Sequence, residues 1–294
     1  MQMQNYIITT DNTTDLPSDF YTRHRLPCIH IDYTIDDICY DGGVSDLSPT
    51  EFYNRIRGGA MPITQQANPE KCREFFESFL RDGLDILHIA FSSGLSGTYQ
   101  SNTIAADELR EKYPQRKLIV IDSLCASMGE GLLVSEALKR QQSGMPIDEL
   151  AAWVTENRLH IVHDVVADDL FHLQRGGRVS KTAAVVGTAL GIKPLIHLDD
   201  NGKLIPFGKM RGKKAAIAAM VDRLIARIDR SGSYSMVFIS HADCLEDAEE
   251  LEALIRQKAK IDNLLISYIG PTIGAHTGVG TVALFYFAKD RTPN

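Results

Sequence analysis

Residues 85–99 read D-I-L-H-I-A-F-S-S-G-L-S-G-T-Y, and the rest of the chain can be read outward from them. The apolar run from Ile86 to Phe91 has the length of a buried strand, and it stops abruptly in small residues. From Thr98 to Tyr113 the apolar residues recur at helical spacing, with charged residues on the other side. This stretch therefore predicts a strand, a Ser/Gly loop and a helix in succession.

The Ser/Gly loop has the composition of an anion-binding turn. Gly94 and Gly97 permit backbone conformations that other residues avoid. The hydroxyl groups of Ser92, Ser93 and Ser96 can donate hydrogen bonds to a ligand oxygen. The free amides and the positive dipole end of the following helix favour a carboxylate or a phosphate at the same place. The alternative is a tight turn whose serines only cap the helix, and the shape of the segment alone favours this simpler interpretation.

Length and composition describe a globular protein without metal or cofactor. The 294 residues, 44% of them hydrophobic, suffice for two domains, and we place the boundary near residue 158. The formal charge of -7 gives no general attraction to nucleic acids or anionic membranes. The five cysteines are scattered without a C-x-x-C pair, which argues against a disulfide framework or a zinc site. This use of cysteine favours the reduced cytoplasm as location.

Neither end of the chain has the pattern of a membrane segment. The N-terminal residues lack the basic region and long apolar core of a secretory signal. The longest charge-free stretch near the end, residues 271–288, contains a proline, a histidine and three glycines, which disfavours a membrane span.

Strand and helix patterns alternate through the first half of the chain. Strand-like segments at residues 6–10, 86–91 and 117–122 are separated by helix-like segments, which predicts right-handed crossovers and a mostly parallel sheet. Sheets of this kind bind ligands outside the carboxyl ends of their strands. The turns after these three strands, and with them the Ser/Gly loop, should lie at that edge.

A predicted hairpin and a polar linker lie between the first strand and the Ser/Gly loop. β-like patches at residues 29–33 and 37–40 predict the hairpin. The linker, P-I-T-Q-Q-A-N-P at residues 62–69, ends in Asn68 and Pro69, which predict the start of a helix. Its Thr64 is either a hydroxyl in solvent or a second donor beside the Ser/Gly loop.

The second half of the chain changes character. Strand-like residues 192–198 and 203–207 flank D-D-N-G, a hairpin turn signal, which predicts antiparallel pairing. Before them, Arg175, Arg178 and Lys181 surround two glycines in a locally basic segment. These cations either lie in solvent at a helix end or dock a partner that handles phosphate. The segment is not a nucleotide-binding P-loop, because no G-x-x-x-x-G-K-[ST] pattern occurs in the chain.

A glycine-rich loop is predicted near the end, G-P-T-I-G-A-H-T-G-V-G at residues 270–280. Its glycines allow the backbone to approach a ligand closely, and His276 offers a ring nitrogen to an anion. A single loop histidine is more often structural than a ligand contact. The other histidines, in or beside apolar strands, are expected to be neutral and hydrogen-bonded.

Several motifs in one order resemble the DegV family, whose members include the fatty-acid-binding subunits of bacterial fatty acid kinase. The motifs span nearly the whole chain: T-D-N-T-T-D-L-P at 10–17, T-Q-Q-A-N-P at 64–69, F-S-S-G-L-S-G-T-Y-Q-S at 91–101, I-D-S-L-C-A-S-M-G-E-G at 121–131, L-Q-R-G-G-R-V-S-K at 173–181 and I-G-P-T-I-G-A-H-T-G-V-G at 269–280.

This resemblance implies two α/β domains, residues 1–158 with a mostly parallel sheet and residues 159–294 with a mixed sheet, and a lipid site at their junction. It implies that Ser93 and Thr64 bind the carboxylate of a long-chain fatty acid and that His276 completes the polar network. Ser92 and Gly94 belong to the same carboxylate-binding loop. A tunnel for the acyl chain gains about 0.8 kcal/mol per buried methylene, enough to withdraw the acid from a membrane during a transient contact.

The resemblance also implies a partner. In the kinase system, a separate ATP-binding protein phosphorylates the bound acid to an acyl phosphate for phospholipid synthesis. This chain would present the substrate and carry the product, without being an enzyme itself. Arg175, Arg178 and Lys181 would then be candidates for docking the kinase or offsetting the phosphate charge.

Two other functions remain open from the sequence. One is a serine hydrolase acting on an acyl substrate, although neither Ser93 nor Ser96 lies in the G-x-S-x-G pattern of a nucleophile elbow. A triad of Ser93, His276 and a carboxylate could still assemble in space. The other is a regulator without enzymatic role that binds a different lipid.

Overall fold

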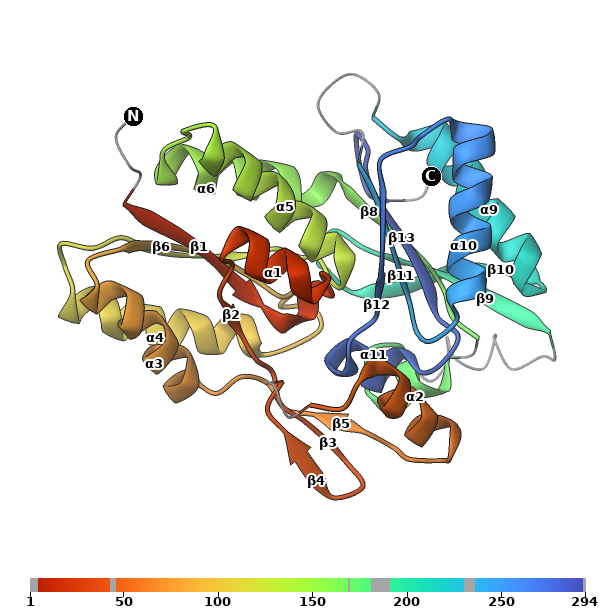
Figure 1. Cartoon of the computed structure of the whole chain (residues 1–294), viewed down its shortest axis with the longest axis horizontal. Helices are drawn as coiled ribbons and strands as arrows, with labels where there is room; N and C mark the ends of the chain where they lie inside the picture. Colours follow the sequence, from red (N-terminus) through yellow and green to blue (C-terminus); the bar gives the residue numbers. More distant parts are fainter. Residues whose placement is uncertain (1–4, 43–45, 169, 181–190, 230–235, 293–294) are drawn as a thin grey trace.

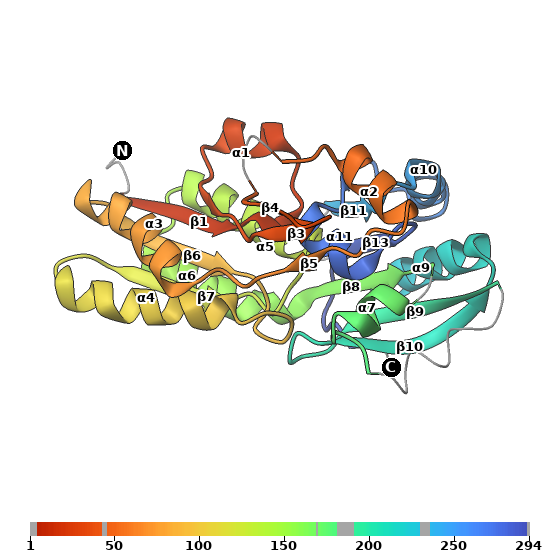
Figure 2. The same ribbon diagram turned by 90° about the horizontal axis from the view of Figure 1, so that it is seen from below.

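The described residues form three β-sheets, and the two larger ones lie at opposite ends of the molecule (Figures 1 and 2). The computed structural model describes residues 5–42, 46–168, 170–180, 191–229 and 236–292. Lys181 and the small apolar segment that follows it lie outside these ranges. Among the described residues, none of the helices has both the length and the apolar character needed to cross a bilayer.

The first sheet is parallel throughout, as predicted. Its strand order is β2-β1-β6-β7. One face packs against α3 and α4 and the other against α5 and α6, so the central strands are buried on both sides. The elements are β1 (Tyr6–Asp11), β2 (Cys28–Ile29), α3 (Pro69–Arg81), β6 (Asp85–Ala90), α4 (Thr98–Lys112), β7 (Leu118–Asp122), α5 (Met128–Gln142) and α6 (Ile147–Asn157); α1 (Ser18–His24) lies beside α5.

Local sequence signals set several of these boundaries. Asn68 caps α3 by accepting a hydrogen bond from Lys71 N at 2.8 Å, and Pro69 occupies the first helical position. Ser48 and Glu51 form a reciprocal capping box at the start of α2 (Pro49–Arg57). The start of α3 agrees with the sequence prediction.

The second large sheet is mixed, with strand order β10-β9-β8-β13-β11-β12. Neighbouring strands are antiparallel except for the parallel pair β11 and β12. Its outer face packs against α9 and α10. The elements are β8 (Ile161–Val166), α7 (Phe171–Arg175), β9 (Ile192–Leu198), β10 (Leu204–Arg211), α9 (Lys213–Arg227), β11 (Val237–His241), α10 (Leu245–Leu254), β12 (Leu264–Tyr268) and β13 (Val282–Phe287).

Helix α5 joins the two large sheets into one core. Its residues from Met128 to Leu138 are all buried. It packs with Ile8 and Leu87 of the parallel sheet and with Phe238 and Phe285 of the mixed sheet in a single hydrophobic cluster. The junction of the two sheets is therefore a packed interior.

The predicted hairpin in the first half is shifted and belongs to a third, small sheet. β3 (Tyr33–Ile35) pairs with β4 (Ile38–Tyr40) and with β5 (Ile63–Thr64). The turn lies at Asp36 and Asp37, whose positive φ angles of 51° and 60° suit a two-residue hairpin. Residues 28–29 instead form a separate short strand in the parallel sheet.

The small sheet and α2 pack onto the second half of the chain. Tyr33, Phe52 and Tyr53 share a hydrophobic cluster with Ile269 and Ala275. The predicted loop at residues 270–280 contains a short helix, α11 (Pro271–Thr277), which begins with proline at its first position. The glycines within this segment concealed the helix from the sequence pattern.

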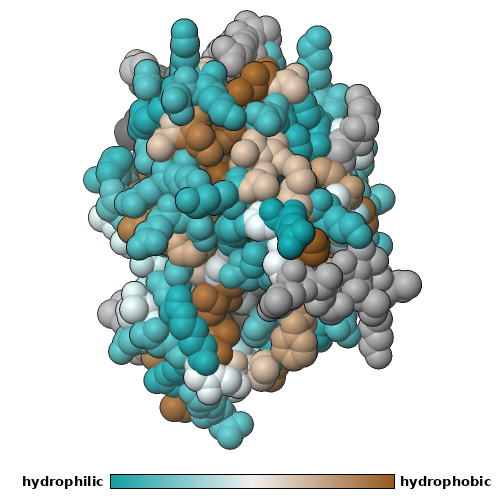
Figure 3. All heavy atoms as spheres, turned by 90° about the vertical axis from the view of Figure 1, so that its right-hand side faces the viewer, coloured by the Kyte–Doolittle hydropathy of each residue, from teal (hydrophilic) through white to brown (hydrophobic). Residues whose placement is uncertain are grey.

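The outer surface over α9 and α10 is mixed in character (Figure 3). Ile225 of α9 and Leu245 of α10 are among the exposed large hydrophobic side chains. The hydrophobic areas visible on this face are separated by hydrophilic ones. Single exposed hydrophobic residues of this kind are normal on soluble proteins and define no docking site by themselves.

Candidate functional site

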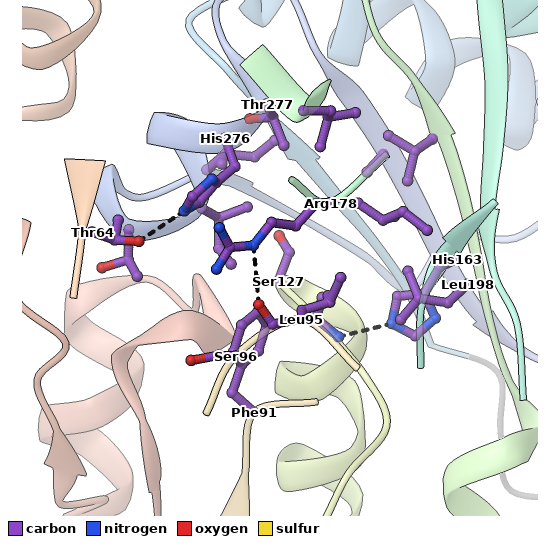
Figure 4. Close-up of a pocket in the computed structure, with 18 of the residues that line it drawn as sticks. Thr64, Phe91, Leu95, Ser96, Ser127, His163, Arg178, Leu198, His276 and Thr277 are labelled. Atoms are coloured by element: carbon purple, nitrogen blue, oxygen red, sulfur yellow. Dashed lines mark hydrogen bonds between the residues drawn. The ribbon is translucent and has the colours of Figure 1, made fainter. Parts of the chain in front are cut away.

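A cavity of about 270 Å³ lies where the carboxyl end of the parallel sheet meets the mixed sheet and α11 (Figure 4). Its walls come from the Ser/Gly loop after β6, the loop before α5, the linker at β5, and strands β8 and β13. The sequence predicted a site at this edge of the parallel sheet, and a cavity is present there. Among the described residues, no group of three or more His, Cys, Asp or Glu side chains is arranged to hold a metal ion.

Most of the cavity wall is apolar. Its apolar side chains come from both halves of the chain, so neither half forms the cavity alone. A wall of this kind removes hydrocarbon from water and suits an elongated apolar ligand. The apolar lining residues are Ile31, Phe91, Leu95, Ala126, Val165, Leu173, Leu198, Leu204, Ile269, Ile273, Ala283 and Phe285.

One part of the wall is polar and brings together two predicted residues. Thr64 Oγ1 and His276 Nε2 are 2.8 Å apart, although they are 212 residues apart in sequence. Arg178 lies beside them (Figure 4). We call Thr64, His276 and Arg178, together with Ser96, the polar end of the cavity.

Arg178 contributes a positive charge that the described residues do not neutralise. Its Nε donates to the carbonyl oxygen of Leu95 at 3.0 Å, and its Nη1 donates to that of Gly176. Within the described part of the chain, no carboxylate lies within ion-pair distance of this guanidinium. Burial lowers the pKa of Arg178 from its ordinary value, yet an arginine remains charged in proteins. A half-buried cation without a countercharge favours an anionic ligand.

His276 is held neutral at the polar end. Burial, followed by the charges of Arg178 and Arg175, lowers the pKa of His276 to about 3. Its Nδ1 is buried and has no hydrogen-bond partner among the described residues. Gly176 packs against this atom so closely that a Cβ there would lie 2.2 Å from it. The ring is thus fixed between Gly176 and Thr64.

Ser96 is the serine of the Ser/Gly loop that lines the cavity. It lines the wall beside Gly97, and its Oγ lies 3.0 Å from Thr98 Oγ1. Gly97 is required for a close approach, because a Cβ there would lie 2.0 Å from Gln66 Oε1. The loop and the linker that carries Thr64 therefore meet at this point, as the sequence suggested.

The structure places Ser93 outside the lining of the cavity. Leu95 N and Ser96 N both donate to the carbonyl oxygen of Ser92 at 3.1 Å, which closes a turn and directs Ser93 outward. Ser93 is exposed and does not line the cavity. The carboxylate contact of Ser93 stays a prediction, and Ser96 is the serine of this loop that lines the cavity.

Ser92 and Gly94 are also outside the cavity lining, and they hold the β9–β10 turn. Ser92 Oγ donates to the carbonyl oxygen of Gly202 at 2.8 Å. A Cβ on Gly94 would lie 2.5 Å from the carbonyl oxygen of Asn201. These two residues therefore fasten the Ser/Gly loop to the second half of the chain.

The two described arginines of the basic segment, Arg175 and Arg178, turn toward the protein interior, and the predicted role of this segment in docking a partner stays a prediction. Arg175 Nη2 donates to the carbonyl oxygens of Pro62, at 2.8 Å, and Ala275, at 3.1 Å. It thereby links the linker to α11, while Arg178 enters the cavity wall. Lys181 lies outside the described residues. The sequence showed that these side chains are charged, but it did not show that Arg175 and Arg178 point toward the protein interior.

Comparison with known proteins gives a consistent result over the full chain. The model of a family described as "Uncharacterised protein, DegV family" matches residues 5–289. A DegV domain-containing protein of Clostridium perfringens is 41% identical over 292 residues, which are 99% of this chain and 100% of that protein. A DegV domain-containing protein of Lactococcus lactis is 36% identical and covers 96% of this chain and 97% of its own length.

Solved structures are similar over the same span. A DegV family protein of Thermus thermophilus, described by its fatty acid binding, has 26% identity and a TM-score of 0.85, with 97% of this chain and 100% of that chain covered. A fatty-acid-binding DegV family protein of Streptococcus agalactiae has 26% identity and a TM-score of 0.85, with 98% and 100% covered. The α/β architecture with one parallel and one mixed sheet is thereby confirmed.

Proposed function

This chain belongs to the DegV family, and from that premise we propose that it binds a long-chain fatty acid in the cavity, with the carboxylate at the polar end. The observation that carries the proposal is Arg178, a half-buried cation without a carboxylate partner among the described residues, at the polar end of a largely apolar cavity. A fatty acid matches both properties, because it joins one negative charge to a long hydrocarbon chain.

The polar end offers donors of suitable chemistry to a carboxylate. With the imidazole proton on Nε2, His276 donates to Thr64, and the hydroxyl hydrogen of Thr64 remains for a carboxylate oxygen. Ser96 supplies a second hydroxyl, and Arg178 supplies the charge. Hydrogen bonds in which one partner is charged are about twice as strong as neutral ones. The bound acid would therefore be held as a carboxylate.

The apolar walls would hold the acyl chain. Each buried methylene contributes about 0.8 kcal/mol, so affinity should rise with chain length until the cavity is filled. His163 lies in this wall but has little polar capacity left. Its Nε2 accepts from Ala126 N at 3.1 Å, its Nδ1 is 3.1 Å from the carbonyl oxygen of Ile161, and burial lowers its pKa well below the usual value.

We further propose that the bound acid is presented to a separate ATP-dependent kinase and that this chain carries the acyl phosphate. The motif resemblance supports this step, and Arg178 would lie near the added phosphate charge. The role places the protein in the cytoplasm, in transient contact with a membrane, and within phospholipid synthesis. We also propose residue 158 as the division between its two α/β domains.

The first experiment is to purify the protein without added lipid, denature it and analyse the organic extract by mass spectrometry. We expect a long-chain fatty acid at nearly one molecule per chain, and a heat-washed sample should bind it again on titration. An empty extract together with no binding of palmitate or oleate would contradict the proposal. Addition of the kinase and ATP would then test for the acyl phosphate.

A further inference from the structure

Ser127, in the cavity wall, has a backbone conformation that serine rarely adopts. It is 5% exposed, and its φ and ψ angles are 52° and -144°. This combination lies close to a region used almost only by glycine. Non-glycine residues held in such conformations cluster at active sites, where the surrounding structure imposes them. The conformation of Ser127 therefore points to a functional role for this residue.

The hydroxyl group of Ser127 is paired with a buried carboxyl group. Its Oγ donates to Asp15 Oδ2 at 2.5 Å and lies 3.0 Å from Ser240 Oγ. The other oxygen of Asp15 accepts from Gly270 N at 2.9 Å, which fixes the orientation of the carboxyl group. A hydroxyl, a base within hydrogen-bond distance and a group that orients the base are the parts of an activated nucleophile.

The turn that carries Ser127 has the geometry of a nucleophile elbow. Strand β7 ends at Asp122 and α5 begins at Met128, so the serine lies on a strand-to-helix turn. Gly129 follows two positions later, and a Cβ there would lie 2.1 Å from His163 Nε2. In such elbows the amide after the nucleophile stabilises the oxyanion, and here Met128 N lies in the first helical turn, whose amides lack intrahelical partners. The sequence C-A-S-M-G concealed the elbow because its first position is not glycine.

We propose that Ser127 is a nucleophile, with Asp15 as its base, for the hydrolysis of a long-chain acyl ester or thioester whose chain occupies the cavity. Ser127 Oγ attacks the carbonyl carbon and its proton passes to Asp15 Oδ2. The oxyanion is held by Met128 N, and the leaving alcohol or thiol departs with the proton from Asp15. A water molecule then attacks the acyl-serine ester, gives one proton to Ser127 through Asp15, and releases the fatty acid.

Two kinetic properties follow from the surroundings. Burial raises the pKa of Asp15 to about 8, and a base acts in its ionised form, so acylation should rise with pH and level off above about 8. The titratable groups that face Asp15 are Glu130 of α5, Tyr21 of α1 and Tyr53 of α2, and burial raises the pKa of each. The inference rests on the proposed fatty-acid-binding function, because the fatty acid bound in the cavity would be the product of this reaction. Slow release of that fatty acid should limit turnover after an initial burst.

The test uses p-nitrophenyl decanoate and an alkyl fluorophosphonate with the full chain. We expect a burst of nitrophenol close to one per chain, and a covalent phosphonate on Ser127, located by tandem mass spectrometry within residues 118–139. Ser127→Gly should abolish both, and glycine tolerates the φ angle of this position, which protects folding. Asp15→Asn should slow acylation at least 100-fold and remove its pH dependence. Ser78→Ala, which removes an exposed hydroxyl of α3 outside the cavity, should leave both signals unchanged.

Palmitate titration of Ser127→Gly separates this inference from the proposed function. Binding retained within about twofold, together with loss of the burst, supports the nucleophile. A wild-type protein that binds palmitate but shows neither burst nor label, or a label that persists in Ser127→Gly, overturns it. If palmitate does not bind but the burst and label depend on Ser127, the proposed carrier function fails and the nucleophile stands.

Discussion

The polar end of the cavity holds a cation, whereas buried carboxyl groups lie behind the wall at Ser127, and this contrast shows how an anionic ligand would be oriented. At the polar end, the guanidinium of Arg178 donates only to carbonyl oxygens among the described residues. Behind the cavity wall at Ser127, which we call the acidic side, Asp15 and Glu130 are buried carboxyl groups, and within the described residues neither forms an ion pair. The charge of Arg178 would be balanced by a bound anion, whereas Asp15 and Glu130 reduce their negative charge by retaining protons. An anionic group should therefore turn toward Arg178 and away from the acidic side.

Replacing Asp15 by asparagine removes an ionisable group from the acidic side, and we expect the largest effect here, on the pH dependence of the free energy of unfolding. Burial raises the pKa of Asp15 from 3.8 to about 8, so the folded protein keeps a proton that the unfolded chain releases between these values. The contribution of Asp15 to the free energy of unfolding should thus be largest at low pH and fall as pH rises from about 4 to about 8, by roughly 5 kcal/mol. Urea unfolding of the ligand-free wild type and of Asp15→Asn at several pH values should show this loss as the difference between the two proteins.

Asp19 provides the control for this measurement. Its side chain is 64% exposed in a surface ion pair with Arg23, so Asp19→Asn should keep the pH dependence of the wild-type protein. Equal pH slopes for Asp15→Asn and Asp19→Asn would mean that Asp15 titrates normally and that the acidic side is charged at neutral pH.

Replacing Arg178 by methionine removes the cation from the other side. The carboxylate would then be buried without a countercharge, and we expect palmitate binding to weaken by about 3 kcal/mol, or roughly 100-fold. Isothermal titration with palmitate measures the change. Arg178→Lys should fall between the two, because it keeps the charge but not the planar group.

Arg23→Met, which removes an arginine that is 67% exposed on α1, is the matched control and should bind as the wild type does. A normal palmitate affinity in Arg178→Met would place the carboxylate elsewhere in the cavity.

Gly176→Ala tests the position of His276 at the polar end, because it displaces the imidazole without changing any charge. Its backbone φ is -73°, which alanine adopts easily, but the new Cβ would lie 2.2 Å from His276 Nδ1. Loss of the contact between Thr64 and His276 should weaken palmitate binding by about 2 kcal/mol. Gly97→Ala meets only the flexible end of Gln66 and should have a smaller effect. The opposite order of the two variants would show that His276 does not support the carboxylate.

Two serines of the same loop provide the smallest and most selective test. Ser96→Ala removes a hydroxyl from the cavity wall and should weaken palmitate binding by about 1 to 2 kcal/mol. Ser93→Ala removes an exposed hydroxyl outside the wall and should not change the affinity. If the effects were reversed, the carboxylate would contact Ser93 as the motif resemblance implied, and the loop would have to rearrange on binding.

The fold was largely predictable because its local signals agree with its tertiary structure. The apolar run before Phe91 became β6, and the periodic segment after it became α4. The short helix α11 was not predicted, since it has only seven residues, contains Gly274 and is flanked by Gly270 and Gly278. Packing of the small sheet onto the second half also lacks a sequence signal, because it joins residues more than 200 positions apart, such as Tyr53 and Ile269.

The candidate site was predictable in its location but not in its detail. Thr64 and His276 were expected in one polar network, and the structure places them 2.8 Å apart. The choice between Ser93 and Ser96 depends on a turn closed by backbone hydrogen bonds, and the inward direction of Arg178 depends on carbonyl groups. The type of side chain alone predicts neither the turn nor the direction of Arg178, because backbone groups determine both. The backbone of Ser127 is likewise visible only in three dimensions.

The packing of α2 against the second half has a consequence for synthesis on the ribosome. Tyr53 donates its hydroxyl hydrogen to the carbonyl oxygen of Ile269, 216 residues later in the chain. At a translation rate of about 5 to 20 residues per second, that partner emerges roughly 10 to 40 s after Tyr53. During this interval the aromatic face of α2 has no native neighbour from the second half, so the nascent chain should be a substrate for chaperones until its last strands are made.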